Sequence, residues 1–244
     1  ENRARDPVGA RMKIDVLTLF PGLVEAFFSE SILGRAVDRG FVSYRAVNIR
    51  DFADDKHRTA DDAPYGGGAG MVLKPAPLGA ALDSVGAEKR RTIYPSPSGR
   101  RFTQDVAQEL AAEDELVFIC GRYEGVDQRI IDHYVDDELT IGDYVVSSGE
   151  LSALVIVDAV VRLIDGVITP ESLSEESFTD GLLEYPQYTR PEVYKGMRVP
   201  EVLLTGHHER IREWRQQQRI EKTRANRADL LDAVHNENSE EAEE

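Results

Sequence analysis

Short apolar segments alternate with segments of helical spacing from residue 12 to residue 164, and this alternation limits the fold more than any other feature of the chain. Strands are predicted at 12–20, 42–49, 92–94, 116–120 and 138–141. Helices are predicted around 23–28, 78–85, 103–112, 126–134 and 149–164. Strands that alternate with helices favour an α/β fold with a parallel sheet.

Composition excludes several classes of protein. The 244 residues are 41% hydrophobic and 30% charged, which is typical of a globular chain and not of a disordered one. The formal charge of −16 argues against a protein that coats nucleic acid without specificity. A single cysteine, Cys120, permits no intrachain disulfide, so we expect a reducing cytoplasm. The most apolar stretch, 151–164, contains Asp158 and Arg162 and is too short for a membrane span.

Composition also divides the chain into domains. Residues 1–11 precede Met12 and are interpreted as an extension or a cloning remnant, and 12–168 form the α/β domain. A segment rich in Pro, Ser, Thr and Glu predicts a linker at 169–175, followed by a helical domain at 176–231. Between 187 and 231 there are ten basic and six acidic residues, which suits a surface for RNA phosphates. The acidic segment 232–244 is expected to be a disordered tail.

Three polar, glycine-containing loops follow predicted strands, where α/β proteins bind ligands. They are Pro97-Ser98-Gly99-Arg100, Cys120 to Gly125, and Ile141 to Glu150. Glycines let the backbone approach a flat ligand and present N–H and C=O groups to it. Each loop alone is equally well an ordinary turn, but three together favour a binding site. The glycine-rich segment 65–70 lacks the Gly-Lys-Ser/Thr ending of a phosphate loop, which argues against ATP chemistry. No G-x-G-x-x-G follows the first strand, which argues against a Rossmann cofactor.

A set of motifs runs in order from Met12 to Leu231. It comprises Leu19-Phe20-Pro21, Asp55-Lys56-His57-Arg58-Thr59, Asp61-Asp62, Pro64 to Met71, Cys120 to Gly125, Ile141 to Val146, Gly149-Glu150-Leu151, Ser177-Phe178, Gly181-Leu182-Leu183, Tyr188-Thr189-Arg190-Pro191, Val199-Pro200, Val202-Leu203-Leu204, Gly206-His207-His208 and Trp214-Arg215. With these motifs the chain resembles the bacterial tRNA (guanine-N1)-methyltransferases that modify guanosine 37, beside the anticodon. They form the TrmD family of the SPOUT superfamily.

The resemblance implies a SPOUT-type parallel sheet with a C-terminal trefoil knot, joined to a small all-α domain. It further implies a homodimer with shared active sites, the tRNA anticodon loop as partner, and S-adenosylmethionine as methyl donor, with Mg²⁺ expected as well. The residues that it assigns to the donor, all in the three loops, are Pro97, Gly99, Gly121, Tyr123, Glu124, Ile141, Gly142, Asp143, Tyr144, Val145, Val146 and Gly149.

Methyl transfer to guanine N1 requires removal of the N1 proton and stabilisation of charge on O6. The resemblance assigns the general base to Glu176, where the family usually has aspartate, and the arginine to Arg162. Glu175 and Asp180 remain alternative bases. From the residues alone, Glu176 is interpreted as a helix cap, and Arg162 as the partner of Asp158 in an ordinary i, i+4 ion pair. Ser148 replaces the family's usual glycine and demands ordinary backbone angles or a small rearrangement.

Three further residues are assigned to substrate binding: Asp61, Arg122 and Arg190. Arg122 is either a solvated loop charge or a contact to guanine or phosphate. Asp61 either lies in a solvated loop or, as the resemblance implies, orders the glycine-rich segment 65–70 as a lid over the target base. No metal ligands are predicted, because His207 and His208 have no neighbouring cysteine, and Cys120 is expected to be inert packing.

Two other functions stay open at this point. The departures at Glu176 and Ser148 fit a non-catalytic or weakly catalytic RNA-binding relative, which methyl transfer to tRNA would exclude. A metabolite-binding α/β enzyme would show no salt-dependent tRNA binding by its C-terminal segment.

Overall fold

A computed structural model describes residues 11–173 and 175–231, so the predicted tail at 232–244 and the predicted extension, apart from Arg11, lie outside the described residues. The chain divides between Ile168 and Thr169 into two compact units. Arg11 donates to the carbonyl oxygen of Asp165 at 2.8 Å, and its guanidinium lies over the ring of Phe41. This last residue of the expected extension therefore contacts the first unit.

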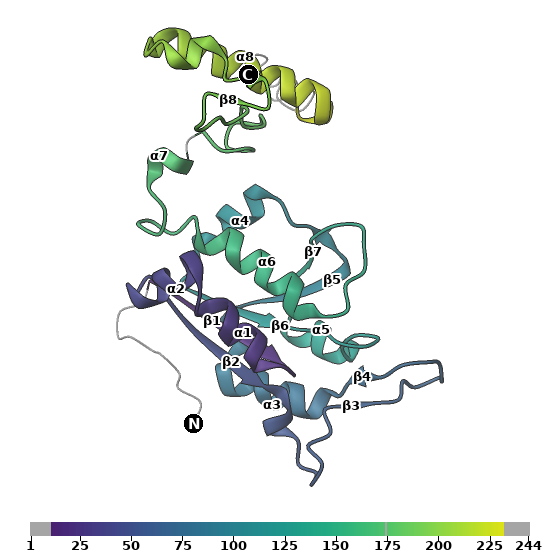
Figure 1. The fold of residues 1–244 in the computed structure, drawn as a ribbon. Coiled ribbons are helices and arrows are strands. Elements are labelled where there is room, and N and C mark those ends of the chain that lie inside the picture. Colours follow the sequence, from purple (N-terminus) through teal and green to yellow (C-terminus); the bar gives the residue numbers. More distant parts are fainter. Residues whose placement is uncertain (1–10, 174, 232–244) are drawn as a thin grey trace, which may run out of the picture. The chain divides into compact units, whose positions relative to one another are not determined.

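The first unit contains a five-stranded sheet in the order β2-β1-β6-β5-β7 (Figure 1). Its strands are β1 (Met12–Thr18), β2 (Val42–Asn48), β5 (Arg91–Arg101), β6 (Glu115–Ile119) and β7 (Asp137–Thr140). Every pair of neighbouring strands is parallel, which confirms the α/β class and the parallel sheet.

Helices cover both faces of this sheet. One face packs against α1 (Pro21–Phe28), α2 (Ser31–Asp38), α4 (Gln104–Ala111) and α6 (Gly149–Val161). The other packs against α3 (Pro75–Val85) and α5 (Gln128–Tyr134). Helix α6 ends at Val161 and not at the predicted 164, so Arg162 is its C-cap residue.

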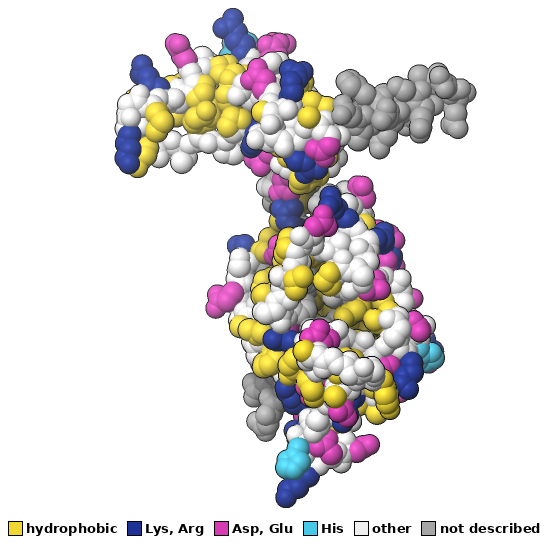
Figure 2. Space-filling model, turned by 90° about the vertical axis from the view of Figure 1, so that its right-hand side faces the viewer, with side chains coloured by type: hydrophobic (Ala, Val, Ile, Leu, Met, Phe, Trp, Pro, Cys, Tyr) yellow, Lys and Arg dark blue, Asp and Glu magenta, His cyan; other side chains and the backbone are white. Residues whose placement is uncertain are grey.

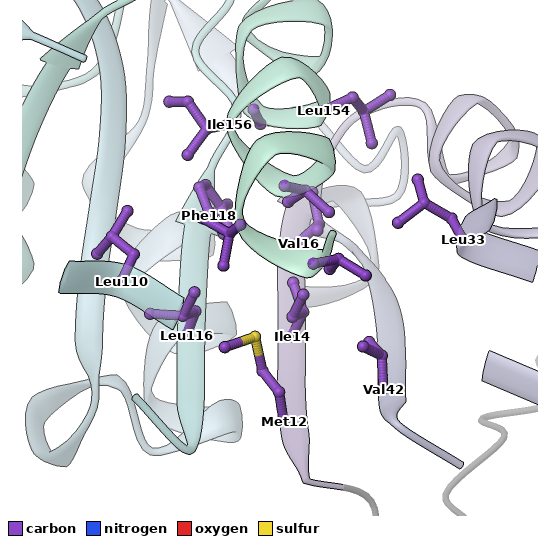
Figure 3. Packing of buried hydrophobic residues seen from close by; sticks show 14 of the residues in the cluster. Met12, Ile14, Val16, Leu33, Val42, Leu110, Leu116, Phe118, Leu154 and Ile156 are labelled. Atoms are coloured by element: carbon purple, nitrogen blue, oxygen red, sulfur yellow. The ribbon is translucent and has the colours of Figure 1, made fainter. Parts of the chain in front are cut away.

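The alternation of side chains along the central strands fills two cores. Ile14 and Val16 of β1 point to the core under α6, whereas Leu17 belongs to the core on the opposite face. Leu116 and Phe118 of β6 lie beside them under α6 (Figure 3). Each fully buried side chain of this size contributes roughly 1.5–3 kcal/mol. The buried central strands therefore hold the loops at their carboxyl ends in place.

Strand β5 is interrupted where it borders β7. Ile93, Tyr94 and Pro95 pair with β7, and pairing resumes at Arg100, so residues 96–99 leave the sheet as a loop. Asp137 accepts from Arg91 and from Arg100, each at 2.7 Å. Because these two arginines precede and follow the loop, the buried carboxylate ties both of its ends to β7.

Shorter elements complete the first unit. They are the 3₁₀ helices η1 (Ile49–Phe52) and η2 (Ala87–Lys89), and the antiparallel pair β3 (Asp61–Asp62) and β4 (Val72–Leu73). The polar loop predicted after residue 51 therefore contains a short hairpin, whose connection carries the glycine-rich segment. Gly66, Gly67, Gly68 and Gly70 all have positive φ, which explains the choice of glycine.

The second unit differs from the expected all-helical domain. It contains α7 (Pro170–Leu173), a hairpin of β8 (Val193–Tyr194) and β9 (Met197–Arg198), η3 (Glu201–Leu204) and α8 (His208–Asn226). Lys195 and Gly196 both have positive φ and form the two-residue turn that joins the hairpin strands. Helix α7 lies in the stretch predicted as a linker.

Polar contacts to α8 organise the second unit. Arg219 is buried and donates to the carboxylate of Asp180, and the hydroxyl of Thr223 accepts from the backbone N–H of Leu183 at 2.9 Å. Arg215 lies over the ring of Tyr185. These contacts fix the segment before residue 186 to the long helix.

Candidate functional site

The loops that follow β6 and β7 and the loop within β5 meet around a cavity of about 250 Å³ at the carboxyl edge of the sheet. Nine of the twelve residues predicted to bind the donor line it: Pro97, Gly121, Tyr123, Glu124, Ile141, Tyr144, Val145, Val146 and Gly149. Tyr94, Thr140, Ser148 and Ser152 also line it and were not predicted. The three loops that sequence spacing selected thus converge on one site.

Two glycines let these loops cross at van der Waals distance. The backbone N–H of Gly149 donates to the carbonyl oxygen of Gly121 at 2.9 Å. A Cβ atom at Gly149 would lie 2.5 Å from the nitrogen of Gly121, and one at Gly121 would lie 2.9 Å from the ring of Tyr94. Neither position has room for a side chain unless backbone or a buried aromatic ring moves.

Three predicted donor-binding residues do not line the cavity. Gly99 packs against the backbone of Glu138 and Leu139, where a Cβ atom would overlap that strand. Gly142 has φ of +154° and lies under the ring of Tyr144. Asp143 is exposed and forms an ion pair with Arg101 at 3.2 Å. The two glycines shape the loops, whereas Asp143 points to a surface partner.

The loop after β6 contains an unusual backbone conformation. Tyr123 has φ of +57°, in the left-handed region that disfavours residues with a Cβ atom, and its side chain is 55% exposed. The next residue, Glu124, donates its backbone N–H to Met71 at 3.0 Å, and Gly125 accepts from Leu73 at 3.0 Å. The loop is therefore held against β4 and the residue before it, which follow the glycine-rich connection of the hairpin.

Burial changes the acidity of two groups beside the cavity. The pKa of Tyr94 is raised because its ring is buried and because Glu138 lies near. Burial also raises the pKa of the Cys120 thiol well above its usual value. A thiol that stays protonated is a poor nucleophile, which agrees with a packing role for Cys120.

Arg122 is held by its neighbours. Its Nε lies 3.2 Å from a carboxylate oxygen of Glu150, one terminal nitrogen donates to the Ser147 carbonyl at 3.3 Å, and its guanidinium lies 4.3 Å from the centre of the Phe20 ring. Glu150 is fully buried and was not predicted as a site residue. An acidic residue in the first turn of a helix that is mostly apolar is the signal that could have revealed it.

The other two predicted substrate residues are not among those that line this cavity. Asp61 is in β3, opposite Leu73 of β4, so it is part of a hairpin and not of a solvated loop. Arg190 belongs to the second unit, is exposed, and precedes Pro191 through a cis peptide bond.

The predicted catalytic residues belong to different units. Arg162 is the partly buried C-cap of α6 in the first unit. Glu176 lies in a bend of the second unit, after the end of α7, so no helix begins there and a helix-cap role is wrong. Asp180 is bound by Arg219, which lowers the pKa of its carboxyl group. Glu175 accepts from Tyr185 at 2.6 Å and from Arg215 at 3.2 Å.

Ser148 needs no rearrangement of the backbone. Its φ of −156° and ψ of 135° are extended values that any residue adopts, and its side chain is buried at the cavity. The serine in place of glycine is therefore compatible with the loop.

Two features are absent from the described ranges, 11–173 and 175–231. Within them no three His, Cys, Asp or Glu side chains gather as metal ligands would, so the expected Mg²⁺ has no such site there. No helix in the same ranges has the length and apolarity needed to span a bilayer.

Large apolar side chains are exposed on both units. In the first unit, Leu23, Leu151 and Val155 are each about half exposed, and the first two border a cavity of about 540 Å³ along α1, α2 and α6. In the second unit, Tyr194 and Met197 of the hairpin are more than half exposed. Figure 2 shows hydrophobic side chains gathered on the second unit among basic and acidic ones.

Comparisons with known proteins identify the family. A sequence model of the family described as tRNA (Guanine-1)-methyltransferase TrmD matches residues 12–233. The chain is 63% identical over 225 residues to a tRNA (guanine-N(1)-)-methyltransferase of Treponema denticola, which covers 92% of this chain and 93% of that relative. It is 60% identical over 223 residues to the protein of that description from Treponema pallidum, with 91% and 89% covered. The chain therefore belongs to the tRNA (guanine-1)-methyltransferase family of enzymes.

Proposed function

We propose that the protein transfers the methyl group of S-adenosylmethionine to N1 of guanosine 37 in tRNA. The observation that carries the proposal is the meeting of three polar loops around one cavity at the carboxyl edge of a parallel sheet, in a chain of this family. Ligands of open α/β sheets bind at this edge.

The residues at the cavity fit the donor. Pro97, Ile141 and Val146 supply apolar walls for an adenine ring, and the loop backbones supply N–H and C=O groups for its polar edge and the ribose. Glu124 provides a carboxylate for the ammonium group of the donor's methionine part. When bound, S-adenosylmethionine supplies a methyl group on a sulfonium, which is already a good electrophile. The residues of the chain have only to hold it and to manage one proton.

The close backbone crossings support the expected trefoil knot. Gly121 and Gly149 belong to the loops after β6 and β7, and Gly99 packs against β7. We propose that these crossings are the tight part of the knot, where only glycine leaves room for one chain segment to pass another.

In the proposed reaction, Glu176 accepts the N1 proton and Arg162 stabilises the negative charge that develops on O6. Asp180 is less suited to be the base, because a carboxyl group whose pKa is lowered by an arginine accepts a proton less readily. Asp61, Arg122 and Arg190 are proposed to position the tRNA. The accommodation of Ser148 removes one of the two reasons to prefer a non-catalytic relative.

The partners follow from charge and exposed surface. The exposed members of the ten basic residues between 187 and 231 are proposed to contact phosphates of the anticodon arm, in an otherwise acidic protein. The apolar face of Leu23, Leu151 and Val155 is proposed to be covered by a second copy of the chain, which gives the homodimer with shared sites. This activity places the protein in the cytoplasm.

The test is transfer of a tritiated methyl group from S-adenosylmethionine to tRNA transcripts that carry G or A at position 37. We expect donor binding by calorimetry and transfer only to the G37 transcript. Donor binding without transfer would support the non-catalytic alternative, and absence of donor binding would contradict the proposed cofactor site.

A further inference from the structure

We propose that Glu150 is a positioning residue that locks together the loops of the donor site before any ligand binds. This inference rests on the proposed function, because it concerns the same cavity. It is carried by the contacts of one buried carboxylate, which join its own segment of the chain to two others that are far apart in sequence.

Each oxygen of the Glu150 carboxylate accepts from a different segment. Oε1 accepts from the hydroxyl of Thr18 at 2.6 Å, at the carboxyl end of β1. Oε2 accepts from Nε of Arg122 at 3.2 Å, in the loop after β6. Glu150 itself follows Gly149 in the first turn of α6, where the helix dipole favours a negative charge.

The two partners extend this contact to the neighbouring loops. The Thr18 hydroxyl also accepts from the backbone N–H of Phe20 at 2.8 Å, which fixes the start of α1. Arg122 donates to the carbonyl oxygen of Ser147 at 3.3 Å and lies over the Phe20 ring. The carboxylate is therefore the centre of a closed network between the segments at 18–20, 121–125 and 147–150.

Burial of a carboxylate costs free energy because the charge loses its hydration, and a partner of the opposite charge must compensate this loss. Several of its neighbours line the donor cavity, whereas Glu150 does not. Its position between those loops explains why a charged residue occupies an apolar helix. The network holds the Gly121–Gly149 crossing closed, so that the donor enters a preformed cavity and does not bear the entropic cost of ordering it.

The primary variant is Glu150→Gln. Glutamine has the same shape but only one oxygen and no charge, so the hydrogen bond to one partner is lost or reversed and the Arg122 guanidinium loses its compensating charge. The matched control is Asp15→Asn. Asp15 is also fully buried and paired with two arginines, Arg45 and Arg90, but it lies within β1 and does not line the cavity.

Two readouts are measured for each variant, beside thermal unfolding. In ligand-free protein, hydrogen exchange of peptides covering 121–125 and 147–150 should accelerate in Glu150→Gln and not in Asp15→Asn. Calorimetry should show S-adenosylmethionine affinity reduced roughly ten- to a hundredfold in Glu150→Gln, as for the loss of a hydrogen bond to a charged group, and by less than about twofold in Asp15→Asn. A Glu150→Gln protein with unchanged exchange and unchanged donor affinity would overturn the proposal, even if its Tm falls.

A second pair of variants keeps the test decisive if Glu150→Gln does not fold. Thr18→Val removes the hydroxyl that joins Glu150 to Phe20, whereas Thr18→Ser keeps it. We expect Thr18→Val to weaken donor binding and Thr18→Ser to recover most of the loss, and equal affinities for the two would contradict the network. If the wild type itself fails to bind S-adenosylmethionine, the proposed function is wrong, and the exchange measurement still decides the role of Glu150.

Discussion

The backbone N–H of Gly149 donates to the carbonyl oxygen of Gly121 at 2.9 Å, which joins the loop after β7 to the loop after β6. The bond needs glycine on its donor side, because a Cβ atom at Gly149 would lie 2.5 Å from the nitrogen of Gly121. Both glycines line the proposed donor cavity. The crossing of the two loops is therefore part of the site and not only of the scaffold.

We predict that Gly149→Ala weakens S-adenosylmethionine binding and lowers the free energy of unfolding by about 1–3 kcal/mol, as overpacking does. Calorimetry and urea unfolding measure the two effects. The control is Gly22→Ala in α1, where nothing lies within 4 Å of an added Cβ atom and alanine favours the helix. Equal donor affinities for the two variants would show that the crossing does not shape the cavity.

Replacement of the proposed base should affect chemistry and not binding. We predict that Glu176→Gln lowers the single-turnover rate of methyl transfer about 10²- to 10⁴-fold, because an amide cannot accept the N1 proton. The affinities for donor and tRNA should stay within about twofold. The neighbouring Glu175→Gln is the control: it loses contacts to Tyr185 and Arg215 but should retain transfer. Loss of transfer in Glu175→Gln alone would reassign the base.

The apolar face of α6 should decide the oligomeric state. We predict that Leu151→Glu, which places a charge on a half-exposed apolar surface, converts a dimer into a monomer of 27.3 kDa in analytical ultracentrifugation. Leu204→Glu is the control, because Leu204 is equally exposed but belongs to the second unit. A wild-type protein that sediments at the monomer mass would refute the proposed dimer.

The ion pair between Asp180 and Arg219 should make the second unit sensitive to acid. Arg219 lowers the pKa of Asp180 below its ordinary value of 3.8, so the carboxylate stabilises the folded state above that pH. This contribution is lost as the pH falls through the lower folded-state pKa. The difference in the free energy of unfolding between wild type and Asp180→Asn should therefore be smaller at about pH 3 than at about pH 6.

Fluorescence of Trp214, the one tryptophan of the chain, monitors this unfolding within the second unit. Asp143→Asn serves as a control, because its exposed pair with Arg101 contributes little at either pH. If the free energy of unfolding of Asp180→Asn differs from that of wild type by the same amount at both pH values, the pairing of Asp180 with Arg219 is contradicted.

Local patterns in the sequence predicted the parallel sheet well, because burial on both faces produces apolar strands such as 116–120. They predicted the second unit less well. The hairpin around Lys195 and Gly196 has only two residues in each strand, too few for an alternating pattern to be visible. Its turn depends on positive φ at both residues, and of the two only Gly196 is a residue type that indicates positive φ in a sequence.

The sequence by itself determined the family, the five strands of the parallel sheet, and the three loops that form the candidate site, because motif order, side-chain periodicity and glycine content are local properties of the chain. Only the tertiary structure decided which residues meet. Glu150 joins Thr18 and Arg122, and Asp143 turns to Arg101 and not to the cavity. These pairings depend on hydrogen-bond distances between segments separated by as many as 132 positions, and no local pattern encodes such distances.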